Sequence, residues 1–149
     1  MDDIDRQILD ILQRDGKVSQ ARIGESVGLA TPSVNERIKK LETRGFIRRF
    51  TALLDPSLVG VPVVAYVDVG LEHPRFERPF LDEIELLGGV QECHAISGDF
   101  GYRLKVRCRN VEELEAILRE KIQTIRGVAR TRLDLALSVK KDSTILPLS

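Results

Sequence analysis

Apolar residues in the first 45 positions recur with the spacing of three short helices. The first predicted helix begins behind the acidic residues Asp2 and Asp3 and ends at Asp15-Gly16. Its apolar residues fall at i, i+4, i+7 and i+8 and so form one stripe: Ile4, Ile8, Ile11 and Leu12. Ser19 can cap a second short helix, which Gly28 ends.

The third predicted helix follows a turn at Gly28 to Ala30. It begins at Thr31 with Pro32 in its first turn, where a missing N–H has no cost, and it stops at Gly45. Its buried stripe consists of Val34, Ile38 and Leu41. Two helices joined by a short turn after a first helix predict a helix-turn-helix. Residues 46–54 are then expected to form one or two short strands, a wing.

The spacing of apolar residues changes after two turn-forming segments, Asp55-Pro56-Ser57 and Gly60-Val61-Pro62. Beyond them the pattern predicts a strand over 63–69, a helix over 77–87, strands over 90–97 and 102–108, a helix capped by Asn110 with Glu113, and a strand over 128–139. This βαββαβ order is the ferredoxin-like split motif. The predicted fold class is therefore α+β: a winged helix-turn-helix in residues 1–54, a linker in 55–61 and a ferredoxin-like domain in 62–149.

The first strand of the ferredoxin-like domain is apolar on both sides of its pleat: Val63, Val64, Ala65, Tyr66 and Val67. Two helices cover only one face of such a sheet, so a second layer must cover the other face. A second copy of the same sheet is the simplest candidate, and the chain is expected to form a homodimer. The alternative is that the N-terminal helices fold back over the sheet.

Composition places the chain among folded, soluble proteins, with 149 residues, 42% hydrophobic and 31% charged. The longest apolar run, Val59 to Val67, is far shorter than the roughly 20 residues of a membrane helix. We therefore expect a cytoplasmic chain with no membrane partner. Cys93 and Cys108 belong to no motif and are expected to be buried free thiols, with no metal bound and no cofactor implied.

Within the first 50 residues positive charge is concentrated in one window, although the 23 basic and 23 acidic side chains of the whole chain cancel. Residues 1–30 carry four basic and six acidic side chains, whereas residues 31–50 carry six basic and two acidic ones. This cationic window coincides with the third predicted helix. With its apolar stripe turned inward, that helix presents a polar and basic face of the kind that enters a major groove of double-stranded DNA.

The chemistry of the side chains suggests their contacts with DNA. Ser33 and Glu36 can reach base edges, and Glu36 can accept a hydrogen bond from a cytosine amino group. Lysine and arginine suit phosphates, as do the free N–H groups at the start of the preceding helix. The predicted DNA-binding set is Ser19, Gln20, Thr31, Ser33, Asn35, Glu36, Arg37, Lys39, Lys40 and Arg44. The alternative is an ordinary solvated face, with Arg37 paired to acids of the first helix.

A series of short motifs runs in order through the whole chain. It comprises Asp2-Asp3-Ile4-Asp5-Arg6-Gln7-Ile8-Leu9, Val27-Gly28-Leu29, Arg37-Ile38-Lys39-Lys40-Leu41-Glu42, Gly45-Phe46-Ile47, Ala52-Leu53-Leu54-Asp55, Gly98-Asp99-Phe100-Gly101-Tyr102 and Gly127-Val128. In order and spacing it resembles the Lrp/AsnC family of prokaryotic transcriptional regulators. The resemblance implies a winged helix-turn-helix on an effector-binding and oligomerisation domain, dimers that associate further, often to octamers, and amino acids or related metabolites as effectors.

Three positions depart from the family pattern. Ala30 stands where a serine often precedes the recognition helix, so the cap is expected to move to Thr31. Gly24 stands in the second helix where alanine is favoured, at an expected cost of up to about 1 kcal/mol of helix propensity. Gly101 stands where the turn Gly-x-x-Asp-Tyr has its aspartate, which favours an altered or absent effector response.

The resemblance implies that this turn lines the effector site. Gly98 and Gly101 permit positive φ, so their N–H groups can hold the carboxylate of a free amino acid. Asp99 can accept from its ammonium, and Tyr102 can contribute a hydroxyl or a ring. The alternative is a turn without a ligand, with Tyr102 in the core. An effector that acts must favour one assembly state over another.

Other function classes fit the residues less well. An RNA-recognition module shares the βαββαβ order, but Lys105 and Val106 occupy positions where its stacking aromatics are required. An enzyme is not expected, because there is no phosphate loop or paired-histidine motif, and His73 and His94 fit loop and strand-face positions. A small-molecule-binding regulatory protein whose helix-turn-helix contacts proteins is the remaining alternative, and it leaves the basic face unexplained.

Overall fold

The computed structural model describes residues 1–148 and divides them into two compact units. One unit comprises Met1–Leu53 together with residues 141–148, and the other comprises Leu54–Lys140. The sequence assigned residues 62–149 to a single domain, so the grouping of the C-terminal tail with the N-terminal helices is a difference from that expectation.

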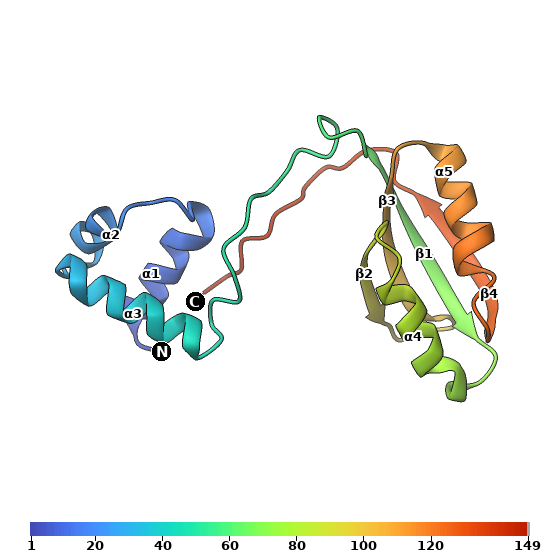
Figure 1. Ribbon diagram of the computed structural model, residues 1–149, viewed down its shortest axis with the longest axis horizontal. Helices are drawn as coiled ribbons and strands as arrows, with labels where there is room; N and C mark the ends of the chain where they lie inside the picture. Colours follow the sequence, from blue (N-terminus) through green and yellow to red (C-terminus); the bar gives the residue numbers. More distant parts are fainter. Residues whose placement is uncertain (149) are drawn as a thin grey trace. The chain divides into compact units, whose positions relative to one another are not determined.

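The N-terminal unit contains three helices (Figure 1): α1 (Asp3–Arg14), α2 (Gln20–Val27) and α3 (Thr31–Thr43). Asp2 caps α1 and exchanges hydrogen bonds with Asp5 in a capping box, so both acids satisfy N–H groups at the start of the helix. The three apolar stripes meet in one core of fully or largely buried side chains, as predicted: Ile8, Ile23, Val34, Ile38 and Leu41.

The predicted wing is absent from the described residues. The N–H groups of Phe46 and Ile47 both donate to the Leu41 carbonyl, at 2.9 and 3.2 Å, and the chain after them forms no strand up to Val63. A strand needs a neighbour to accept and donate its backbone hydrogen bonds, and none of the described residues supplies one here. The segment leaves Phe50 and Leu53 largely exposed.

The C-terminal unit has the predicted βαββαβ order. Its elements are β1 (Val63–Leu71), a 3-10 turn η1 (Pro74–Phe76), α4 (Glu77–Glu85), β2 (Val90–Ala95), β3 (Gly101–Cys108), α5 (Val111–Ala116), a π-helical continuation η2 (Ile117–Ile122) and β4 (Val128–Leu135). The sheet has the order β2-β3-β1-β4, and each neighbouring pair is antiparallel. This is the ferredoxin-like arrangement.

Several details of this unit differ from the sequence prediction. α4 ends at Glu85 and β2 ends at Ala95, each two residues earlier than predicted. β4 ends at Leu135 rather than at Val139, because the last pairing on that edge is the hydrogen bond from the Ala136 N–H to the Val64 carbonyl. At the start of α5, Asn110 accepts from the Glu113 N–H, but Glu113 accepts from the Arg109 N–H instead of closing a capping box with Asn110.

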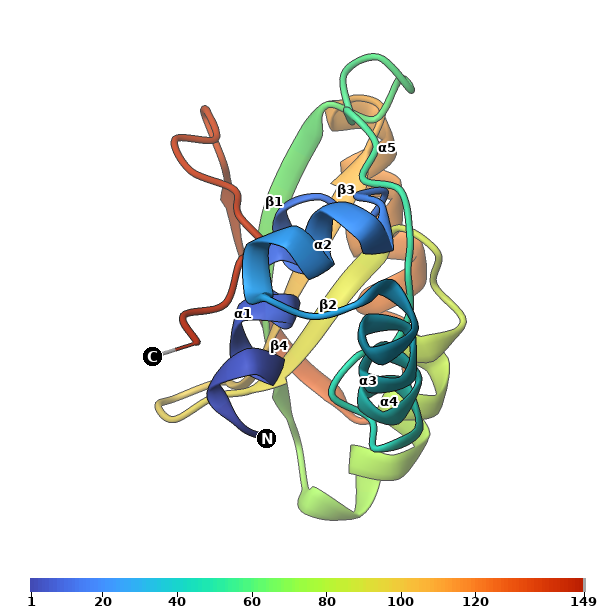
Figure 2. The ribbon, with the colours of Figure 1, turned by 90° about the vertical axis from the view of Figure 1, so that its left-hand side faces the viewer.

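Both helices of this unit cover the same face of the sheet (Figure 2), where Ala65, Val67 and Val69 of β1 pack in one core with Phe80 of α4 and Leu114 of α5. The residues between them on β1 face the other side. Val64 is buried there and Tyr66 is partly exposed, but the next residue on that face is a buried carboxylate, Asp68. The second face is therefore built around an ionic group, and it is not uniformly apolar as the start of the strand suggested.

Candidate nucleic-acid interface and effector site

The turn between α2 and α3 is held by local interactions that the sequence predicted in part. Ser19 caps α2 by accepting from the Arg22 N–H, and Gly28 ends it in the left-handed conformation, with φ 72°. The Leu29 N–H then donates to the Gly24 carbonyl at 2.9 Å. The expected shift of the next cap to Thr31 is wrong, since the N-cap of α3 is Ala30, which has no side chain that can bond to the helix.

The outer face of α3 carries the polar side chains that the helical spacing placed there. Ser33, Glu36, Lys39 and Lys40 are exposed, while the apolar stripe is buried. Lys40 Nζ lies 2.6 Å from Glu36 Oε1, and this ammonium lowers the pKa of the Glu36 carboxyl. Because both side chains are two-thirds exposed, water and salt compete with the pair, and both groups remain available to a ligand.

Arg37 has a different environment from the other basic residues of α3. Its guanidinium contacts Asp2 at 2.8 Å and Asp5 at 2.7 Å, which ties α3 to the start of α1. Hydrogen bonds to these two carboxylates raise the pKa of Arg37, the one to Asp2 most. The structure thus shows the ion pair with the first helix that the sequence held open as the alternative to a phosphate contact.

The other predicted residues also have definite places. The side chain of Gln20 donates to Asn35 at 3.3 Å, so these two residues link α2 to α3. Thr31 is exposed in the first turn of α3. The guanidinium of Arg44, just after α3, lies 5.0 Å from the centre of the Phe46 ring. Ser33, Glu36, Lys40 and Arg44 help to line one hollow with Arg37, so five of the ten predicted residues lie together, whereas the other five do not line this hollow.

The sequence-derived set omits two basic residues that the structure exposes. Arg48 and Arg49 are exposed in the segment after α3, and the structure gives them no ion pair among residues 1–148. They belong to the same cationic window, and that membership is the signal that could have found them. The sequence places Arg48 and Arg49 in the predicted wing and assigns them no contact with DNA.

The candidate effector turn between β2 and β3 has the backbone that its glycines predict. Gly98 has φ 113° and Gly101 has φ 103°, a region that side-chain-bearing residues rarely adopt. Asp99 is exposed in this turn. Tyr102 lies apart from these residues on the helix-covered face, where its ring centre is 5.1 Å from that of Phe80. Burial and the neighbouring Glu77 carboxylate raise the pKa of Tyr102 to about 12.

A cluster beside this turn was not predicted from the sequence. Phe100 lies under two guanidinium groups of β4, those of Arg130 at 4.5 Å and Arg132 at 5.2 Å from the ring centre. Arg130 also donates to the Asp99 carbonyl. Arg132 and Arg103 both donate to Asp68, whose pKa is lowered, chiefly by the hydrogen bond from Arg103. Residues from four separate segments form this cluster, and no local pattern links them.

Comparison with known proteins gives the family. The model of the AsnC-type helix-turn-helix domain matches residues 1–42, and that of the Lrp/AsnC ligand binding domain matches residues 64–146. The chain belongs to the Lrp/AsnC family of transcriptional regulators. It is 35% identical over 148 residues to the leucine-responsive regulatory proteins of Klebsiella pneumoniae and Escherichia coli K12, a span of 98% of this chain and 90% of each relative.

Solved structures of other transcriptional regulators have the same fold. A transcriptional regulator of Neisseria meningitidis in complex with L-Met matches with a TM-score of 0.95 at 26% identity, covering 99% of this chain and 97% of the other. An AsnC family regulator from Agrobacterium tumefaciens matches with a TM-score of 0.93 at 33% identity, with the same coverage. Escherichia coli AsnC also matches with a TM-score of 0.93, at 26% identity and 99% coverage of both chains.

These matches confirm the predicted family, the helix-turn-helix followed by a ferredoxin-like domain, and a function in transcription regulation. They do not favour the alternative in which the helix-turn-helix serves only protein contacts. These relatives carry the names of regulatory proteins or transcriptional regulators. No helix in the described part of the chain is long and apolar enough to cross a membrane.

Proposed function

We propose that this Lrp/AsnC regulator reads its DNA site with the outer face of α3. The observation that carries the proposal is that residues 31–50, with six basic and two acidic side chains in a neutral chain, form an exposed face on the helix after the turn. In this assignment Ser33 and Glu36 contact base edges, while Lys39, Lys40 and Arg44 contact phosphates. Ser19 and Gln20, at the start of α2, face a phosphate as that helix crosses the backbone. Thr31 and Asn35 border the base-reading positions.

The structure changes the role that we give to Arg37. Its two ion pairs with α1 supply a fixed orientation for α3, so we assign it to positioning the recognition helix. Lys40 is different because its partner Glu36 is on the same exposed turn. Binding of Lys40 to a phosphate releases Glu36 to accept from a base, so the two contacts can form together.

Selection of bound genomic fragments followed by affinity measurements tests this assignment. Lys40→Ala is expected to weaken binding to all sequences and to lower the slope of log affinity against log salt by about 1, the value for one phosphate. Ser33→Ala and Glu36→Gln are expected to change which site is preferred, with little effect on the salt slope. If all three variants lose the same affinity regardless of sequence, α3 does not read bases.

We propose that the DNA-binding unit is presented in duplicate by a homodimer that can assemble further, to octamers. Two features of the single chain support this. The extended segment after α3 and the following turn expose large apolar side chains, with Leu53 75% and Leu58 86% exposed. The face of the sheet opposite the helices carries no helix of the C-terminal unit among the described residues and includes Tyr66, which is 38% exposed. Such apolar surface is typical of a self-association interface.

Sedimentation velocity tests the assembly. A dimer or a larger closed assembly is expected at micromolar concentration, and a monomer at that concentration would exclude the proposal. Leu58→Ser and Leu53→Ser are expected to shift the distribution toward smaller species. Tyr66→Ser tests the contribution of the sheet face separately.

We propose a free amino acid or a related small metabolite as the effector, bound beside the turn of Gly98 to Gly101. The L-Met complex of the Neisseria relative supports this ligand class. Both glycines have positive φ, a conformation found in turns whose N–H groups bind anions, and Asp99 is exposed to accept from an ammonium. The position of Tyr102 in the helix-covered core supports a structural role for that residue instead of ligand contact.

Calorimetric titration with the twenty amino acids tests the effector. Binding of at least one of them is expected, and Gly101→Asp, which restores the family residue, is expected to change the affinity or the preference. If none of the twenty amino acids gives a heat of binding at concentrations up to millimolar, an amino acid effector is refuted for this chain. An effector that binds must also shift the assembly or the DNA affinity, because only a difference in affinity between two states can be transmitted.

A further inference from the structure

The C-terminal tail makes a specific contact with α1. Two hydrogen bonds join the side-chain amide of Gln13 to the backbone of Leu146: Gln13 Nε2 donates to the Leu146 carbonyl at 2.9 Å, and the Leu146 N–H donates to Gln13 Oε1 at 2.8 Å. The two residues are 133 positions apart. A planar amide paired in this way to both groups of one residue copies the reciprocal bonding of two antiparallel strands.

The orientation of the Gln13 amide is fixed by its neighbours. Its Nε2 also donates to Asp10 at 3.0 Å, and Asp10 is held in turn by two hydrogen bonds from Arg14 at 3.1 Å. Both N–H donors of the amide and its oxygen therefore have partners, and the reverse orientation would place the NH₂ group against the Leu146 N–H. The surface of α1 is arranged to receive an extended peptide at this point.

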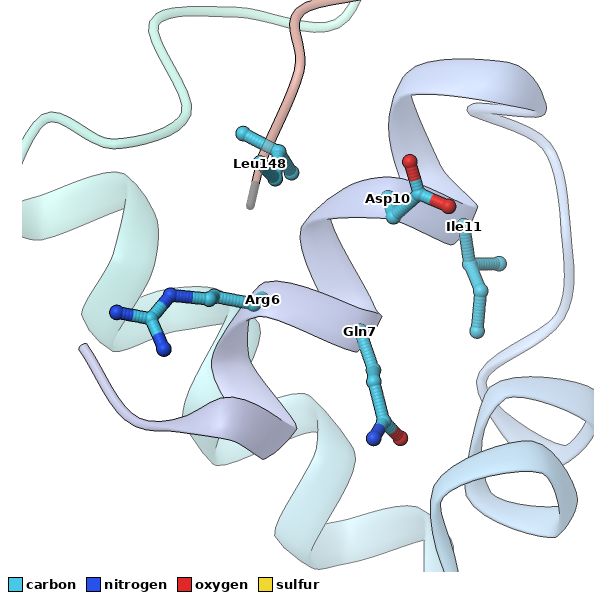
Figure 3. A pocket seen from close by; sticks show the side chains of 5 residues that line it. All are labelled: Arg6, Gln7, Asp10, Ile11 and Leu148. Atoms are coloured by element: carbon cyan, nitrogen blue, oxygen red, sulfur yellow. The ribbon is translucent and has the colours of Figure 1, made fainter.

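The tail has the matching conformation and shape. Pro147 follows Leu146, and a residue before proline is restricted to extended conformations, so its N–H and carbonyl point to the same side. Leu148 is partly buried and borders a hollow on α1 (Figure 3) that is lined by Arg6, Gln7, Asp10 and Ile11. The tail thus forms hydrogen bonds with one turn of the helix through Leu146, and it places the apolar side chain of Leu148 beside a different turn.

We propose that residues 145–148 dock on α1 as a strap, which gives the DNA-binding unit a second attachment to the rest of the chain. The first attachment is the covalent connection between α3 and β1, and residues 136–144 join the end of β4 to the strap. A unit held at two points explores fewer orientations than a unit on one linker. The docking itself does not depend on the proposed function, since it involves neither DNA nor effector.

The variant that tests the docking is Gln13→Met in the full chain. Methionine keeps the length and helix propensity of glutamine but provides neither hydrogen bond, so the helix is retained and the strap is released. Gln123→Met is the matched control, because it makes the same change and also removes a side-chain hydrogen bond, the one from Gln123 to Thr131, in the unit that does not contain residues 141–148.

Amide hydrogen exchange measured by NMR shows whether residues 145–148 are docked on α1. The Leu146 amide is expected to exchange about tenfold faster in Gln13→Met than in the wild type, and at the wild-type rate in Gln123→Met. Equal exchange of Leu146 in all three proteins would overturn the docking. A second NMR experiment uses a mixture of isotope-labelled and unlabelled chains, in which only contacts between two different chains are detected. No contact between Ile11 of one chain and Leu148 of another is expected, since such a contact would show that the tail of a second copy occupies the site.

A DNA experiment tests whether the strap restricts the DNA-binding unit, and this part rests on the proposed function. Wild-type protein is expected to lose affinity when the two half-sites of a selected fragment are moved apart by two base pairs, whereas Gln13→Met is expected to tolerate the change at least about threefold better. If the released strap leaves the spacing preference unchanged, the restraint is refuted. If the wild type binds no DNA, the proposed function fails while the docking result stands.

Discussion

The buried carboxylate of Asp68 should make a large, pH-dependent contribution to the stability of the C-terminal unit. Asp68 is 2% exposed and accepts hydrogen bonds from Arg103 Nε at 2.7 Å, from Arg103 Nη2 at 2.9 Å and from Arg132. Replacing it in Asp68→Asn keeps the volume but removes the charge. Asparagine also turns an NH₂ group toward one of the guanidinium donors.

The magnitude follows from what remains after the change. Removing one member of a fully buried ion pair typically costs 3–5 kcal/mol, because the other charge stays buried. Here the side chains of Arg103 and Arg132 are 43% and 52% exposed, so water can solvate them again. The cost should therefore be near that of removing charge-assisted hydrogen bonds, about 2 kcal/mol. For a unit of roughly 90 residues this lowers the Tm by about 10 °C.

The same residue sets the direction of the pH dependence. The arginines hold the pKa of Asp68 below its ordinary value of 3.8 in the folded protein, so folding favours the ionised form. The stabilisation is fully present above the unfolded pKa and is lost as the pH falls through the folded pKa. The gap between the wild type and Asp68→Asn should thus be largest near neutral pH and should shrink in acid.

Thermal and urea unfolding followed by circular dichroism at pH 7 and at pH 3 measures both effects. Asp134→Asn is the control, because this carboxylate on the adjacent strand is 62% exposed and lies 3.6 Å from Arg132. Its removal should change stability by no more than about 0.5 kcal/mol. The reasoning is refuted if Asp68→Asn unfolds like Asp134→Asn at pH 7, or if its deficit is the same at both pH values.

Three further predictions use single substitutions. Gly24→Ala should destabilise the N-terminal unit by about 1–2 kcal/mol despite its better helix propensity, because the new Cβ would lie 2.4 Å from the Leu29 carbonyl oxygen; calorimetry beside Gly16→Ala, whose Cβ meets only Phe50 and Leu12 at ordinary distances, checks this. In Tyr66→Phe the remaining tyrosine, Tyr102, should titrate in the ultraviolet at about pH 12, and stability should fall as the pH rises above 10, where the unfolded phenol ionises; titration near 10 would contradict its burial. Arg37→Ala should lower the Tm of the N-terminal unit and leave the salt slope of DNA binding intact, whereas Lys39→Ala should lower that slope by about 1 and leave the Tm intact; the reverse pattern would make Arg37 the phosphate contact.

Helix ends and periodic faces were predictable because their causes are local. Ser19 and Gly28 act within one turn of the helix that they bound, and the burial of Ile8, Val34 and Leu41 follows from a spacing of 3.6 residues. The strand order followed from the alternation of elements. Most of the fold and the exposed face of α3 could therefore be derived from the sequence.

The features that escaped prediction depend on contacts between distant residues. From helix propensity alone, Gly24 was expected to destabilise the second helix. In the structure the backbone of Gly24 lies so close to the Leu29 carbonyl that no side chain fits between them. Arg37 had two plausible partners, phosphate and carboxylate, and only the fold brings Asp2 and Asp5 to it. Asp68, Arg103 and Arg132 meet across three strands, so no periodicity links them. The prediction of a wing over residues 46–54 was wrong because a strand requires a hydrogen-bonded neighbouring strand, and the spacing of residues in the sequence does not show whether one is present.

Both ends of the chain are engaged by the same helix. Asp2 caps α1 and bonds to Arg37, and Leu146 bonds to Gln13 near the other end of that helix. A purification tag or a fluorescent fusion joined directly to residue 2 or to residue 146 would therefore disturb a structural contact of the DNA-binding unit. Reporter groups are better placed in the exposed loop at Glu72 and His73, which belongs to the other unit.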